Sequence, residues 1–240
     1  MTRRILQIVI LCLLTSVPAY SFTLQKHGIG TTSATFTSGN TGGDLLVAIV
    51  VRIGSLTITT PTDTIGNTWV DGGAGVVAYG GSDDGMELFF VASAKSTGSN
   101  NVVSSSTANA IAIMDWSGSS GVVDVYNTNA NASSGTGASN NITVASTTTN
   151  AADLVIGGFG MGIGEPSAMT AGTNVAWAAS DTGTSTILSE YFVQSSAGAI
   201  VTDGNQPGGS GYPYGGVMTA FKPAAASCTS HKSLLGTGCI

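Results

Sequence analysis

The chain has 240 residues, enough for one or two domains of ordinary size. Only 8% of the residues are charged while 42% are hydrophobic, and 34 residues are glycine, so a coiled coil, a helix bundle and a polytopic membrane protein all fit this composition poorly. The formal net charge of −6 excludes the basic surface that nucleic-acid binding requires.

Residues 1–21 have the layout of an export signal. Two arginines precede an apolar stretch over residues 5–17, and small residues stand three and one positions before a cleavage point between Ser21 and Phe22. The stretch is shorter than the roughly 20 residues that a membrane-spanning helix needs. We expect removal of residues 1–21 to give a secreted protein, extracellular or at the cell surface, with no membrane span. An uncleaved N-terminal anchor is the alternative.

Short apolar runs bounded by glycine, asparagine and aspartate fill residues 32–222. They are rich in β-branched residues, and none carries an apolar stripe at helical spacing. Strands are predicted at residues 44–51, 56–60, 87–92, 110–116, 122–126, 141–144, 153–156, 187–193, 199–201 and 217–221. The predicted fold is all-β, a two-sheet antiparallel sandwich of the jelly-roll kind, formed as one domain over residues 22–223.

The sequence also repeats itself at an offset of about a hundred residues. Residues 43–48 are similar to residues 152–157, and residues 89–93 are similar to residues 191–195. We therefore expect two related halves, with their strands interleaved in the one sandwich. A flexible linker between two domains, near residues 118–137, is the alternative.

The C-terminal tail, residues 224–240, contains the two cysteines that remain in the mature chain, Cys228 and Cys239. An exported protein enters an oxidising compartment, so a disulfide bond that closes a small loop is expected. Pairing with a cysteine of another chain is the alternative.

Four elements occur in an order that resembles a class of exported bacterial β-sandwich domains. They are a Gly-Asp-Leu-Leu-Val strand (residues 43–47), an Asp-x-x-Gly-Asn-x-aromatic hairpin (63–69), a paired-aromatic strand (89–90) and an aromatic-Ser-Gly strand end (116–118). The resemblance implies a jelly-roll-like fold and an exported location. It implies no activity and no catalytic residues.

Acidic turns provide the candidate metal ligands. Asp63, Asn67 and Asp71 offer the hard oxygen ligands that calcium prefers, and Asp83 and Asp84 form a second acidic turn. The alternative is a hairpin turn in which the Asp63 side chain bonds the backbone and no ion is held. Calcium is the only cofactor that the sequence suggests.

Catalytic groups are scarce in this sequence. It has two histidines, His27 and His231, and it lacks a Gly-x-Ser-x-Gly elbow. Glu87 and Glu190 stand at matching places in the two halves and are the one candidate pair for glycoside hydrolysis. Outward-facing residues on repeated strands are the alternative, and we expect a protein that is not an enzyme.

Tyr212 and Tyr214 flank a proline in a Gly-Tyr-Pro-Tyr-Gly turn, a rigid presentation of rings that suits stacking on sugars. Packing of both rings into the end of the sandwich is the alternative. The sequence thus predicts a secreted binding or adhesion protein whose ligand is a glycan or a surface protein. The alternatives are a self-associating structural subunit of a fibre, coat or surface layer, and a glycan-active hydrolase.

Overall fold

The computed structural model describes residues 21–73, 75–80, 83–131, 141–161, 169–172, 176–182, 186–205, 213–225, 232–233 and 236–237. Most of the predicted signal segment, together with Tyr212, Cys228 and Cys239, lies outside the described residues. Within them, no helix is long and apolar enough to cross a membrane.

The first half of the chain forms two antiparallel sheets. The first inner sheet has the order β1-β9-β3-β7-β5, with β6 joined to β7, and comprises β1 (Thr23–Gly30), β9 (Ala110–Ser117), β3 (Leu45–Arg52), β7 (Asp84–Val91), β5 (Val70–Asp71) and β6 (Val77–Tyr79). The first outer sheet has the order β2-β8-β4 and comprises β2 (Ser33–Phe36), β8 (Asn101–Ser104) and β4 (Thr62–Asp63).

The second half repeats this plan. The second inner sheet has the order β10-β17-β12-β15-β14 and comprises β10 (Ser119–Asn131), β17 (Tyr214–Pro223), β12 (Leu154–Met161), β15 (Thr186–Val193) and β14 (Ala176–Thr182). The second outer sheet has the order β11-β16-β13 and comprises β11 (Asn141–Thr148), β16 (Gly198–Asn205) and β13 (Thr170–Ala171). A separate hairpin pairs β18 (Lys232–Ser233) with β19 (Gly236–Thr237).

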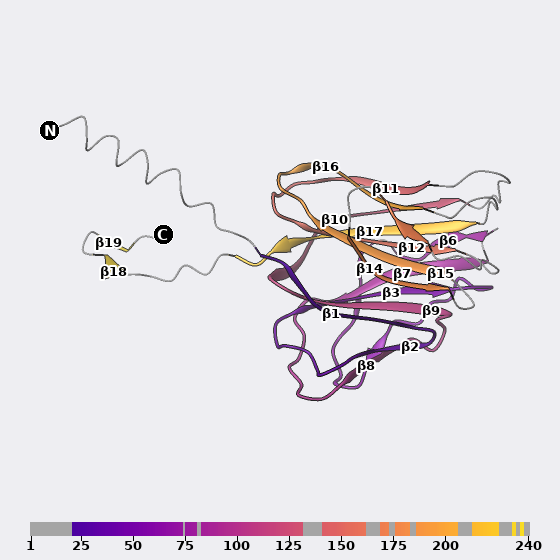
Figure 1. The fold of residues 1–240 in the computed structure, drawn as a ribbon, viewed down its shortest axis with the longest axis horizontal. Helices are drawn as coiled ribbons and strands as arrows, with labels where there is room; N and C mark the ends of the chain where they lie inside the picture. The colour runs from indigo at the N-terminus through magenta and orange to yellow at the C-terminus, as the bar shows by residue number, and fades with distance from the viewer. Residues whose placement is uncertain are drawn as a thin grey trace.

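The four sheets stack as four layers, outer, inner, inner, outer, and Figure 1 shows them from β2 and β8 at the bottom to β11 and β16 at the top. Alternate residues of the central strands point to opposite faces. On β3, Val47 and Ile49 pack between the two inner sheets, while Leu46 and Ala48 pack against the first outer sheet. Because both faces of β3 are covered, the strand is apolar throughout instead of alternating.

Small residues on one inner sheet accommodate large ones on the other. A Cβ atom added to Gly158 would lie 2.7 Å from the Ile49 side chain, and one added to Gly160 would lie 2.8 Å from that of Val51. These β12 glycines therefore allow the bulky side chains of β3 to approach the second inner sheet closely.

The two halves are related by an approximate two-fold axis parallel to the strands. β7 contacts β17 as β15 contacts β9, and β1 contacts β14 as β10 contacts β6. Two aromatic pairs are related by the same axis. Trp116 of β9 lies edge-on to Tyr191 of β15, with 4.6 Å between ring centroids, and Phe90 of β7 lies edge-on to Phe221 of β17, with 5.3 Å between them. The axis makes each strand of the first half equivalent to one strand of the second.

The predicted all-β antiparallel sandwich with two related halves is confirmed. The structure differs from the prediction in two respects. It has four stacked sheets where two were expected, and the halves are stacked and not interleaved, each with its own inner and outer sheet. The predicted strand over residues 56–60 is absent, because this segment pairs with no other strand. The predicted strand over residues 122–126 is present within β10, at an edge of its sheet.

Candidate functional site

The outer face of the first outer sheet carries a depression of about 340 Å³ that is lined by hydroxyl groups. Its lining residues are all serine or threonine: Thr32, Ser33, Thr59, Thr60, Thr62, Ser104 and Ser106. Within the described part of the chain, none of these seven hydroxyls has a hydrogen bond to another protein group, and no charged residue borders the depression. The site thus offers hydrogen bonds and methyl groups to a ligand without fixed charge.

The strand alternation places a part-buried polar network on the inner side of β4, next to the strand residue Thr62 that lines the depression. Thr62 faces outward on β4, and the next residue, Asp63, faces inward. Its carboxylate accepts hydrogen bonds from the Asn67 backbone N–H (2.9 Å), the Asn67 side-chain amide (2.7 Å) and the Trp69 indole N–H (3.1 Å). Burial opposes ionisation of Asp63, but these bonds and one from Asn101 outweigh it and hold the pKa of the carboxyl below its ordinary value.

The five candidate calcium ligands do not form one site. Asp63 and Asn67 lie together, but Asp63 directs its carboxylate at protein donors. The Asp71 carboxylate accepts the backbone N–H groups of residues 73 and 75, and that of Asp84 accepts the N–H of residue 54. Asp83 is exposed. Among the described residues, no three histidine, cysteine or acidic side chains come close enough to hold a metal ion.

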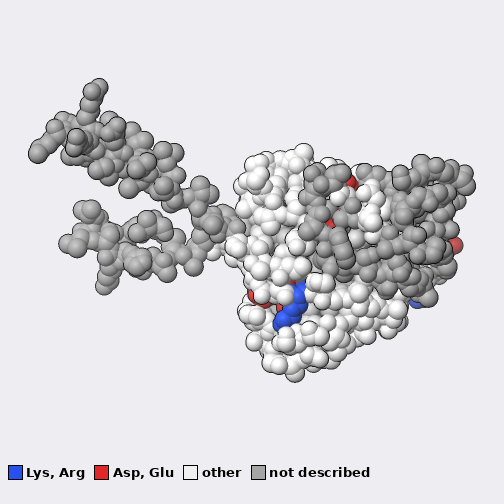
Figure 2. All heavy atoms as spheres, in the orientation of Figure 1, with Lys and Arg blue, Asp and Glu red and all other residues white. Residues whose placement is uncertain are grey.

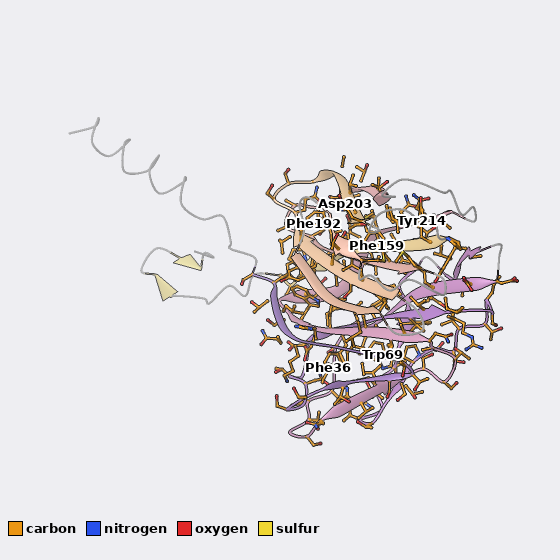
Figure 3. The ribbon with its side chains drawn as sticks, turned by 45° about the vertical axis from the view of Figure 1, so that its right-hand side comes forward. Phe36, Trp69, Phe159, Phe192, Asp203 and Tyr214 are labelled. Carbon is orange, nitrogen blue, oxygen red and sulfur yellow. The ribbon has the colours of Figure 1, made fainter. Side chains whose placement is uncertain are left out.

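The remaining candidates lie in the second half and on the inner strands. Tyr214 is half-buried at the start of β17, where it packs against the core between the second inner and outer sheets. Figure 3 shows it in the upper half with Phe159, Phe192 and Asp203, whereas Phe36 and Trp69 lie in the lower half.

Glu87 and Glu190 do not face each other. Leu88 on β7 and Tyr191 on β15 point between the inner sheets, so both glutamates point away from that interface, each toward its own outer sheet. Burial, followed by the charge of Asp71, raises the pKa of Glu87 to about 7, and burial raises that of Glu190 to about 8. The carboxyls are on opposite sides of two sheets and cannot flank one bond of a substrate.

A buried carboxyl pair that the sequence analysis missed lies at the start of β3. Asp44 and Asp115 are 7% and 0% exposed, and the amide of Asn40 donates to Asp115 at 2.7 Å. One oxygen of each carboxyl has no protein donor. Burial and the Asp115 carboxyl raise the pKa of Asp44 to about 6, and burial also raises that of Asp115, as expected for two acids that share one proton.

The second half has a counterpart of this pair. Asp153 precedes β12 as Asp44 precedes β3, it is fully buried, and its neighbour is Asp124 of β10. Burial and the Asp124 carboxylate raise the pKa of Asp153 to about 7. Burial opposes ionisation of Asp124 as well, but hydrogen bonds from Thr149 and others lower its pKa to about 2, and Lys222 lies 3.4 Å from its Oδ1 atom.

The repeat in the sequence was the available signal for this feature. Asp44 and Asp153 occupy the same place in the two repeats, one residue ahead of an apolar strand. An acid that recurs next to a fully buried strand is itself a candidate buried group. The partner carboxyls Asp115 and Asp124 come from non-equivalent strands, so only the fold could identify them.

Comparison with known proteins gave no relative. No family model matches the sequence, and no curated protein and no solved structure matches the chain.

Proposed function

We propose that the protein is exported and acts outside the cell as a non-enzymatic binding module for an uncharged glycan. The observation that carries the proposal is the depression of the first outer sheet, whose seven hydroxyls form no hydrogen bond with any residue that the structure describes. A sugar presents hydroxyls and C–H faces, which the serine and threonine hydroxyls and the threonine methyl groups complement without charge.

The surface as a whole supports this choice. Figure 2 shows few charged side chains on the described part of the visible face, and most of that surface is neither acidic nor basic. A charged ligand would lack a complementary partner there, whereas a neutral polyhydroxylated one would not. The separation of Glu87 from Glu190 supports binding without turnover.

Glycan-array binding, followed by calorimetry on the best ligand, tests the proposal. Thr62→Val and Ser104→Ala remove hydroxyls from the depression while changing shape little, and each lost hydrogen bond of about 1 kcal/mol weakens binding roughly fivefold. Thr147→Val, an exposed threonine on β11 of the other outer sheet, is the matched control. Equal affinities for all three variants would contradict the assignment.

Export is tested separately, because a binding module need not be secreted to bind in vitro. The N-terminal residue of protein recovered from the medium is expected to be Phe22. Recovery from the cytosol with residues 1–21 intact would refute the extracellular part of the proposal.

A further inference from the structure

Lys222, Asp124 and Asp153 lie on three adjacent strands of the second inner sheet. β17 supplies the lysine, and it runs between β10, which supplies Asp124, and β12, which Asp153 immediately precedes. The Lys222 Nζ atom is 3.4 Å from Asp124 Oδ1, and the Asp124 side chain is only 2% exposed. Asp153 is fully buried, and neither of its oxygens receives a hydrogen bond from an N–H or hydroxyl donor.

We propose that Lys222 and Asp124 condense to an isopeptide bond, with Asp153 as the group that moves the protons. This covalent link would join β10 to β17 at the end of the molecule where the chain leaves the sandwich. The inference concerns a self-modification and is independent of the proposed binding function.

The reaction balances without an oxidant, a cofactor or a second substrate. The ammonium first transfers a proton to Asp124 across the ion pair, which gives a neutral amine and a neutral acid. The amine nitrogen then attacks Asp124 Cγ and forms the N–C bond. The bond between Cγ and Oδ1 breaks, and this oxygen leaves as water after taking a proton from Asp153, which regains one from the nitrogen.

Named groups around Asp124 support each part of this step. The Thr149 backbone N–H donates to Oδ2 at 2.6 Å, so it would stabilise negative charge on the oxygen that becomes the amide carbonyl. The Asn150 side-chain amide donates to Oδ1, the leaving oxygen, at 2.8 Å. No N–H or hydroxyl donor bonds the Asp153 oxygens, so this carboxyl beside Asp124 can give one proton and accept another.

The reacting groups border an open depression through which the product water can leave. An open depression of about 530 Å³ borders Lys222 and Asn150, whereas the two carboxyls lie beneath its surface. The product water therefore has an exit, and burial of the bond protects it from hydrolysis.

The first half provides an internal comparison. It also has one lysine and two aspartates on the equivalent strands, with Lys26 on β1 opposite Asp115 on β9, and with Asp44 just ahead of β3. Here the Lys26 ammonium donates to the carbonyl of Gly39; its charge opposes the rise in the pKa of both carboxyls, but among the described residues it forms no ion pair with either. We therefore expect the condensation in the second half only.

Intact-mass spectrometry of the reduced, folded protein tests the proposal. The expected mass is lower than that of the unmodified chain by one water. Trypsin leaves Asp124 and Lys222 in one peptide, because no lysine or arginine lies between Lys95 and Lys222. Peptide mapping with a protease that cuts between residues 124 and 222, such as chymotrypsin, should show the peptide of Lys222 joined to that of Asp124. Lys26→Arg should leave this loss unchanged.

Three variants separate the chemistry from mere proximity. Lys222→Arg keeps the charge but should show no mass loss, and Asp153→Asn should also show none although both reacting residues remain. In Asp124→Asn the same bond would expel ammonia in place of water, so the variant should lie one ammonia below its own sequence mass and should reach the same final mass as the native protein. Circular dichroism confirms that each variant is folded. An unshifted mass of the native protein, or a water loss that persists in Lys222→Arg, overturns the proposal.

Discussion

The turn that precedes each central strand requires one residue in the left-handed backbone region. In the first half this residue is Gly43, with φ of 91°, and in the second half it is Ala152, with φ of 62°. Glycine adopts this region readily, but the alanine Cβ crowds a backbone oxygen there. A Cβ at Gly43 would contact nothing within 4 Å, so the strain arises from the backbone angle alone.

Exchange of these two residue types is expected to move stability in opposite directions. Ala152→Gly relieves the strain and should raise the free energy of unfolding, while Gly43→Ala introduces the same strain and should lower it, each by about 1 kcal/mol. Urea titrations of both variants measure the two changes. A loss of stability in Ala152→Gly would mean that its turn is not strained.

At the scale of single elements, the second half closes a sheet edge with side chains. On β10, the amide of Asn127 donates to the Ala145 carbonyl at 2.6 Å, and that of Asn129 donates to the Thr143 carbonyl at 2.7 Å. These carbonyls belong to β11, an edge strand of the second outer sheet. Unpaired edge groups favour pairing with another chain, so the two asparagines oppose edge-to-edge assembly.

In the first half, glycines take the place of the two asparagines beside the edge of the outer sheet. By strand register, Gly28 and Gly30 of β1 are the counterparts of the two asparagines. A Cβ at Gly30 would overlap the Ser33 carbonyl oxygen, so β1 and β2 approach too closely for side chains between them. One edge is thus closed by backbone proximity and the other by amide groups.

Removal of the amide groups should expose the β11 edge. The double change Asn127→Ala and Asn129→Ala is expected to cost about 1 kcal/mol for each lost hydrogen bond and to cause concentration-dependent association. Urea titration and size-exclusion chromatography over a range of concentrations measure both effects. Thr57→Ala, an exposed change on a distant loop, is the control. A double variant that stays monomeric would show that the asparagines do not protect this edge.

The sequence predicted most strands but not their division among sheets. Periodicity identified β3, β9 and β17 because their apolar runs have sharp ends, whereas residues 56–60 alternate as a strand does yet have no partner strand. A fully apolar β3 implied burial on both faces, which two stacked inner sheets explain. Which sheet covers each face depends on long-range packing, and a one-dimensional pattern does not contain it.

The candidate site was harder to predict than the fold. The hydroxyls of the depression come from residues near 32, 60 and 105, and threonine and serine are common throughout this chain. Nothing local distinguishes Thr62 from Thr57. The acidic turn at Asp63 was visible, but its role in binding Asn67 and Trp69 was fixed only by the arrangement of the strands around it.

For the molecule as a whole, buried acids govern how stability depends on pH. The pKa is raised to about 6 for Asp44, about 7 for Glu87 and Asp153, and about 8 for Glu190, in each case with burial as the largest cause. In the unfolded chain these groups ionise near their ordinary values of 3.8 for aspartate and 4.5 for glutamate. At pH values between these ordinary pKa values and the raised pKa values of the folded state, the folded state binds more protons than the unfolded state.

Stability should therefore fall as pH rises from mildly acidic values and become level above about pH 8. Each proton that the folded state retains contributes a decrease of about 1.4 kcal/mol per pH unit. Asp63, whose pKa is lowered, acts in the opposite sense and contributes stability that is lost only as pH falls below its ordinary value. Urea titrations at a series of pH values should place the maximum on the acid side of neutrality.

Glu190→Gln isolates one of these protons. Glutamine keeps the oxygen that accepts the Asp203 backbone N–H at 2.7 Å, and it has no proton to lose. Between about pH 5 and pH 7 the variant should lose stability less steeply than the native protein, by about 1.4 kcal/mol per pH unit, and it should be the more stable of the two at the upper end. Parallel slopes for both proteins would mean that Glu190 is already ionised in the folded state.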